Sequence, residues 1–154
     1  MSLSMGKKLS EWVIQRSQTG EGPWYAELSP VPRPEFAFDR YLCRRHCLFL
    51  DSATPQHRLG RYSFLTADPL KWHVSMLDEA SPFKALRHLI RHFHAKRVED
   101  LPPFQGGMAG LWSYDLNRSM EQIPPPQYQD LESPAAAVGI YDTVVAWDHQ
   151  QNRC

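Results

Sequence analysis

A glycine-rich segment at residues 104–112 is the feature that most constrains the fold of this chain. Three of the eight glycines, Gly106, Gly107 and Gly110, fall within five positions. Each would cost a helix about 1 kcal/mol relative to alanine, so a helix is disfavoured here. The neighbouring bulky apolar residues argue against a flexible loop. The segment therefore predicts a central or bulged strand whose backbone packs closely against another backbone.

The overall composition indicates a single neutral domain. The 154 residues include 17 basic and 17 acidic side chains, so no net charge favours nucleic acid or an anionic membrane. No apolar run approaches the roughly 20 residues of a membrane span, and the start lacks a signal peptide. Three cysteines are an odd number, which agrees with a reducing compartment. We expect a cytoplasmic protein, with an expression remnant or disordered start at residues 1–9 and one domain at 10–154.

Periodicity and turn residues predict an α+β fold, mainly an antiparallel sheet with two or three helices packed on it. Clustered prolines predict an irregular chain up to about residue 34. We expect helices at Glu35–Arg45 and Ser81–Arg97, a short helical turn from Tyr114 to Pro124, and strands at Leu48–Leu50, Arg61–Ala67, Trp72–Leu77 and within Ala135–Trp147.

The last residues predict a hairpin that is cut short. Asp148–Asn152 has the composition of a turn, and a returning strand should follow it. The sequence stops at Cys154. We therefore expect a fragment of a larger protein.

Histidine and cysteine clusters suggest metal binding only superficially. Cys43, His46 and Cys47 offer three ligands, but no second cluster completes a tetrahedral site. A small buried thiol at Cys47 is the simpler interpretation. His88 and His92 are spaced i, i+4 without the acidic residue of a zincin motif, which favours a solvated basic helix face. We predict no metal ligands and no catalytic residues in this chain.

Three motifs occur in order along the chain and, taken together, carry a resemblance to a known family. They are the segments 48–53, 60–69 and 103–115, the last followed by Arg118, Glu121 and Pro124. They resemble the amino-terminal region of the chorismate-utilising synthases, which include anthranilate synthase component I and aminodeoxychorismate synthase component I. The resemblance covers roughly residues 10 to 150. Asp51-Ser52 stands where the feedback-regulated anthranilate synthases usually carry Glu-Ser, so the chain looks closer to the para-aminobenzoate branch.

The resemblance implies a tryptophan pocket after the first strand. Ser52 would meet the polar head of the ligand, while Arg61 and Tyr62 would form part of the wall. The alternative is that Ser52 caps a turn and Arg61 makes a surface ion pair. The implied ligand-binding residues are Asp51, Ser52, Leu59, Gly60, Arg61 and Tyr62, and the implied structural motif is Gly106, Gly107, Gly110, Tyr114 and Asp115.

The resemblance also implies what a longer parent enzyme would do. Its carboxy-terminal domain would bind chorismate and magnesium, and a glutamine amidotransferase subunit would supply ammonia that replaces the 4-hydroxyl of chorismate. This chain, with no cofactor of its own, would support that domain or contact the amidotransferase, and it would be inactive alone. The alternatives are the corresponding domain of anthranilate synthase component I, with feedback binding of tryptophan, and a non-enzymatic small-molecule sensor domain.

Overall fold

The computed structural model describes residues 14–16, 22–52, 54, 58–76, 82–93, 96–124 and 133–154. The predictions for residues 1–9, Ser81 and Leu77 therefore lie outside the described residues. The elements in chain order are β1 (Ile14–Arg16), β2 (Trp24–Ala26), α1 (Pro34–Tyr41), β3 (Leu48–Leu50), the 3₁₀ helix η2 (Arg58–Gly60), β4 (Tyr62–Thr66), β5 (Lys71–Ser75), α2 (Pro82–Ile90), β6 (Gly107–Trp112), the 3₁₀ helix η3 (Tyr114–Ser119), β7 (Ala136–Tyr141) and β8 (Val145–Asp148).

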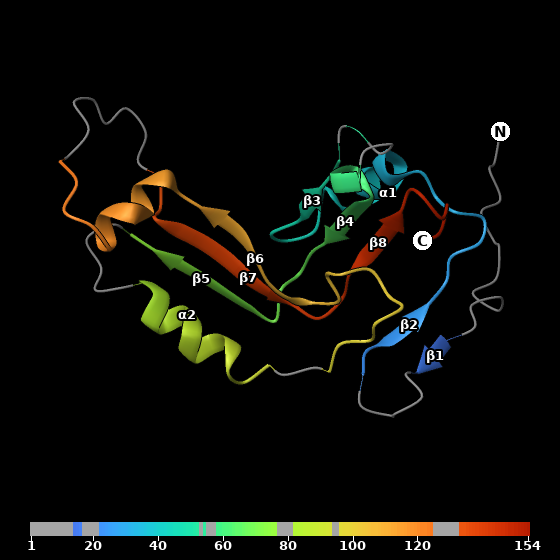
Figure 1. The fold of residues 1–154 in the computed structure, drawn as a ribbon, viewed down its shortest axis with the longest axis horizontal. Coiled ribbons are helices and arrows are strands. Elements are labelled where there is room, and N and C mark those ends of the chain that lie inside the picture. Colours follow the sequence, from blue (N-terminus) through green and yellow to red (C-terminus); the bar gives the residue numbers. More distant parts are fainter. Residues whose placement is uncertain are drawn as a thin grey trace.

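The described strands form three antiparallel sheets (Figure 1). A small sheet pairs β1 with β2, one three-stranded sheet has the order β3-β4-β8, and the other has the order β5-β7-β6. Two stretches of chain pass from one three-stranded sheet into the other, β4 into β5 and β7 into β8. The α+β prediction is confirmed, and the sheet is divided into two connected parts.

The β3-β4-β8 sheet is anchored by aromatic side chains. Phe38 of α1 stacks on Phe49 of β3, with ring centroids 5.0 Å apart. Trp147 of β8 is buried, and its indole N–H donates to the carbonyl of Pro32 at 2.7 Å. This bond satisfies the polar end of a large apolar side chain, so α1 and its preceding loop are fixed on one face of the sheet.

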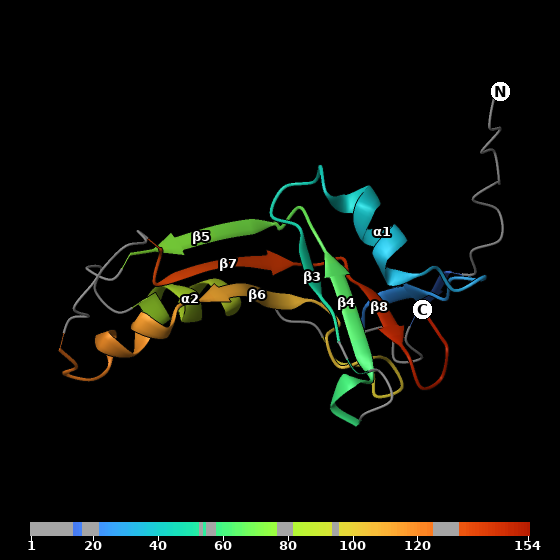
Figure 2. The same ribbon diagram turned by 90° about the horizontal axis from the view of Figure 1, so that it is seen from above.

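In the β5-β7-β6 sheet, β7 is the central strand. Ala136, Val138 and Ile140 point to one face and are buried. Helix α2 lies along that face (Figure 2), where Phe83 stacks on Trp112 of β6 at 6.3 Å. Leu86 of the same helix is buried, as the helical spacing of its apolar residues predicts.

The glycine-rich segment forms β6, an edge strand. The prediction of a central strand is wrong, because β7, with apolar side chains on both faces, takes the centre. The predicted close approach is confirmed at Gly110, where a Cβ atom would collide with the carbonyl oxygen of Ala137 and lie 2.7 Å from the Cα of Val138. A side chain is therefore excluded at this position of β6.

Several elements differ from the predictions. Helix α1 stops at Tyr41 instead of Arg45, and α2 ends at Ile90 rather than near Arg97. The first 34 residues contain β1 and β2, which were not predicted. Each strand has only three residues, and the proline clusters nearby predict an irregular chain. No helix within the described ranges is long and apolar enough to cross a membrane.

Candidate functional site

Four of the six predicted ligand-binding residues meet at one corner of the β3-β4-β8 sheet. Asp51 and Ser52 follow β3, and antiparallel pairing of Leu50 with Phe64 brings them beside the start of β4. The hydroxyl of Ser52 donates to the carbonyl of Tyr62 at 2.8 Å. We refer to Asp51, Ser52, Arg61 and Tyr62 as the corner. The bond uses the proton of Ser52 and leaves its oxygen as an acceptor.

Arg61 is held in place by Asp148 at the end of β8. Its Nε lies 3.0 Å from both carboxylate oxygens, and its Nη2 lies 2.6 Å from Oδ2. Burial acts to raise the pKa of Asp148, but the hydrogen bonds from Arg61 and from the backbone N–H groups of Gln151 and Gln150 hold that pKa below its usual value. The same pairing raises the pKa of Arg61. Arg61 therefore forms an ion pair, as the alternative to a tryptophan pocket predicts, and its side chain is partly buried.

Ser63 connects three segments of chain behind the corner. It is fully buried, and its hydroxyl donates to Oδ1 of Asp51 at 2.7 Å. Nε2 of His149 lies 2.7 Å from the same hydroxyl oxygen. Because Ser63 has one proton, His149 must be the donor in this arrangement. The orientation of Asp51 thus depends on the turn after β8.

Aromatic rings continue the corner along one face of the sheet. The guanidinium of Arg61 lies 4.9 Å from the ring centroid of Tyr62, which is 6.0 Å from the ring of Phe64. Phe104, from the loop before β6, contacts Phe64 edge to face at 5.7 Å. Leu50 lies on the same face and is half exposed. The corner therefore places charged and hydroxyl groups next to apolar surface.

The two remaining predicted ligand residues belong to η2, just before β4. Gly60 is buried, while the side chain of Leu59 is largely exposed. In the structural motif, Tyr114 begins η3 and is 90% exposed. The backbone N–H of Asp115 donates to the hydroxyl of Ser113, which caps η3. Leu59 and Gly60 directly precede Arg61 of the corner, whereas Tyr114 and Asp115 belong to η3, which follows β6 of the other three-stranded sheet.

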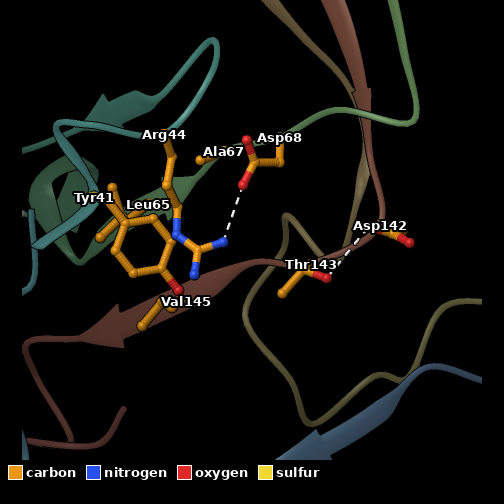
Figure 3. A pocket seen from close by; sticks show the side chains of 8 residues that line it. All are labelled: Tyr41, Arg44, Leu65, Ala67, Asp68, Asp142, Thr143 and Val145. Atoms are coloured by element: carbon orange, nitrogen blue, oxygen red, sulfur yellow. Dashed lines mark hydrogen bonds and ion pairs between the residues drawn. The ribbon is translucent and has the colours of Figure 1, made fainter.

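A small cavity of about 110 Å³ lies elsewhere on the β3-β4-β8 sheet (Figure 3). Its rim carries the ion pair of Arg44 with Asp68, at 2.9 Å, and the ring of Tyr41, whose centroid lies 5.0 Å from the guanidinium carbon of Arg44. Leu65 and Val145 form part of its apolar lining. None of the predicted ligand-binding residues lines this cavity.

The residues considered as metal ligands are exposed or make other contacts. The ring of His46 stacks on Trp72 at 3.8 Å, and Cys43 is exposed. Nδ1 of His92 lies 2.9 Å from the carbonyl oxygen of His88. Among the described residues, no group of three or more His, Cys, Asp or Glu side chains is placed to hold a metal ion.

Sequence reasoning missed Ser63, Asp148 and His149. Ser63 was seen as one polar residue in a strand, and the other two as part of a turn. Their roles depend on the pairing of β4 with β8, which are far apart in the sequence. Arg61 and Asp148, for example, are separated by 87 positions. The opposite charges of Arg61 and Asp148 at two predicted strand ends are the signal that could have indicated this pairing.

Comparisons with known proteins identify relatives of this chain. No protein-family model matches it. Aminodeoxychorismate synthase component 1 of Escherichia coli strain K12 is 31% identical over 133 residues, which are 77% of this chain and 29% of that protein. Anthranilate synthase component 1 of Saccharomyces cerevisiae is 32% identical over 130 residues, which are 81% of this chain and 24% of that protein.

A solved structure shares the fold. The crystal structure of anthranilate synthase component I from Streptococcus pneumoniae TIGR4 matches with a TM-score of 0.50 and 22% identity, over 80% of this chain and 28% of that one. The chain belongs to the chorismate-utilising synthases. Within that family it corresponds to the amino-terminal part of component I, and it spans less than a third of the relatives' length. These relatives are named as component 1, which implies that each of them has a partner component.

Proposed function

We propose that this chain is the amino-terminal domain of an aminodeoxychorismate synthase component I, whose complete form aminates chorismate with ammonia from a glutamine amidotransferase. The observation that carries the proposal is the 31% identity with the Escherichia coli component 1 over 77% of the chain. Asp51 in place of the glutamate usual in feedback-regulated anthranilate synthases supports this branch over the anthranilate one. In the complete enzyme, residues outside this chain would bind chorismate and magnesium.

A fusion enzyme tests this role. The chain replaces the matched region of the Escherichia coli component 1, and formation of aminodeoxychorismate from chorismate and ammonia is measured with magnesium present. We expect the fusion to form product and the 154-residue chain alone to form none. Turnover by the chain alone, or a folded fusion without turnover, would contradict the proposal.

We further propose that the corner binds free tryptophan. The carboxylate of Asp51 and the acceptor oxygen of Ser52 suit an ammonium group. Nη1 of Arg61 has no hydrogen bond to a described residue, and it suits a carboxylate because Asp148 already fixes the other side of the guanidinium. The rings of Tyr62 and Phe64, with the half-exposed Leu50, offer apolar surface for an indole.

Calorimetric titration with tryptophan tests this site. We expect binding by the unsubstituted chain and at least about tenfold weaker binding by Ser52→Ala, because a hydrogen bond to a charged group contributes about 1.5–3 kcal/mol. Ser119→Ala is the matched control, since Ser119 also donates to a backbone carbonyl, that of Leu116, but lies in η3. Equal affinity of all three proteins, or no binding to any, would reject the site.

Feedback inhibition separates the two branches. If tryptophan also inhibits the fusion enzyme in proportion to its occupancy of the corner, the regulated anthranilate synthase alternative gains support. Binding without inhibition fits the para-aminobenzoate branch. The inhibition measurement uses the same fusion and the same Ser52→Ala control.

A further inference from the structure

The β5-β7-β6 sheet has two faces of different accessibility. Helix α2 covers the face of Val138, Ile140 and Trp112. Side-chain alternation places the other residues on the opposite face, which we call the open face. In the three strands and the residue after β5, the open face consists of Trp72, Val74, Met76, Gly107, Ala109, Leu111, Ala137, Gly139 and Tyr141.

The open face carries no charged side chain at these described positions. An antiparallel sheet with one face in water normally alternates apolar and polar residues, so that the wet face is polar. Here the open face is apolar at these positions, and the polar residues of β5, Lys71, His73 and Ser75, lie on the face that α2 covers. This pattern is typical of a sheet that packs against another layer on each side.

Only one end of the open face is covered by described residues. The ring of His46 stacks on Trp72, and the hydroxyl of Tyr141 donates to the carbonyl of His46 at 2.7 Å. Towards the other end, Val74 is 45% exposed, Met76 44% and Leu111 51%. Val74, Ala137 and Leu111 are paired directly across the three strands. Contiguous apolar rows of this kind mark an interaction surface.

We infer that the exposed row of Val74, Met76, Leu111 and Ala137 is the surface that packs against the chorismate-binding part of a component I enzyme. This inference rests on the proposed function. The matched region is 29% of the Escherichia coli component 1, so most of that protein lies outside it and requires a contact surface. A neutral, apolar sheet face fits a permanent intrachain layer, whereas a surface for a separable partner carries a polar rim.

Thiol labelling of Leu111→Cys tests the inference. The variant is prepared in the 154-residue chain and in the fusion with the Escherichia coli component 1, and a soluble maleimide is the probe. Mass spectrometry reads each labelled site separately, so the three native cysteines stay in place. We expect labelling of Leu111→Cys to be at least about tenfold slower in the fusion than in the chain, because opening of a packed layer then limits access.

Met120→Cys is the matched control. Met120 is also an exposed apolar side chain, in the segment after β6, but it lies off the open face. We expect equal labelling rates for this site in both proteins. Equal rates for Leu111→Cys in the two proteins, or equal slowing at both sites, would overturn the inference. Labelling that is slow in the concentrated chain and faster on dilution would also overturn it, because a second copy would then be the occupant.

The readout separates this inference from the proposed function. Labelling does not require turnover, so an inactive fusion that protects Leu111→Cys rejects the aminodeoxychorismate synthase role and keeps the packing surface. An active fusion in which Leu111→Cys stays fully reactive keeps the aminodeoxychorismate synthase role and rejects the packing surface.

Discussion

The two three-stranded sheets are made from the same two long stretches of chain, yet different kinds of side chain hold them. In the β3-β4-β8 sheet, buried polar groups join the strands: Arg61 pairs with Asp148, and the hydroxyl of Thr66 donates to the carbonyl of Thr143 at 2.6 Å. In the β5-β7-β6 sheet, small and aliphatic residues bring the strands together, as at Gly110 against Ala137. Side-chain hydrogen bonds distinguish the first sheet, and the close approach of neighbouring backbones distinguishes the second.

This difference fits the two roles proposed above for the sheets. Polar groups that are fixed by several partners keep defined orientations, which the proposed ligand-binding corner needs. Small residues leave a smooth sheet surface that can lie against another layer. Substitutions that act on one sheet and spare the other can test this division.

The largest effect is expected at Gly110. The Cβ of Gly110→Ala would overlap the backbone of Ala137, and backbone atoms of a central strand cannot move aside. We expect a loss of more than about 4 kcal/mol in the free energy of unfolding, measured by urea denaturation. Gly107→Ala is the control in the same strand: no atom lies within 4 Å of its Cβ, so only the positive φ of 116° contributes, about 1–3 kcal/mol. Equal losses would show that close approach does not decide this sheet.

A smaller effect is expected from the tryptophans. Trp147 is 2% exposed and hydrogen-bonded, so Trp147→Ala should cost about 3–5 kcal/mol. Trp112 is 43% exposed and stacks on Phe83, so Trp112→Ala should cost about 1–2 kcal/mol in the isolated chain. Both values come from urea denaturation followed by circular dichroism. A reversed order would mean that the β5-β7-β6 sheet, and not its neighbour, contains the main core.

The smallest effect at neutral pH is expected from Asp148→Asn, about 1–2 kcal/mol. The pKa of Asp148 is lowered in the folded state, so its stabilisation is fully present above the unfolded value of 3.8 and is lost as the pH falls through the folded pKa. The variant should therefore lose less stability than the native chain as the pH falls below the unfolded value of 3.8. Asp142→Asn, at an exposed position, controls for the loss of one negative charge. Parallel pH profiles for the native chain and Asp148→Asn would show that the ion pair with Arg61 adds nothing.

Local sequence patterns predicted most of the elements. The helix after Ser81 was recognised from apolar spacing, and the strand at Leu48–Leu50 from its continuous apolar run. The glycines predicted a close backbone approach because only a missing Cβ permits one. The hairpin of β1 and β2 was missed, since three-residue strands carry too little periodicity to outweigh nearby prolines.

Contacts between distant segments could not be predicted in the same way. The resemblance to known synthases named Ser52, Arg61 and Tyr62, and the structure brings these residues together at one corner. It could not reveal that Ser63 would connect Asp51 to His149, because the three residues come from separate stretches of chain. Neither could it place β6 at an edge, since strand order depends on which strand has two apolar faces.

The phenol of Tyr141 ties the two three-stranded sheets together where they meet. Burial, together with the nearby thiol of Cys47, raises the pKa of Tyr141 to about 12, and its hydroxyl donates to the carbonyl of His46 just before β3. Ionisation of this phenol requires the bond to be given up. Strong alkali therefore releases the end of β7 from the segment before β3, and with it one direct link between the two sheets.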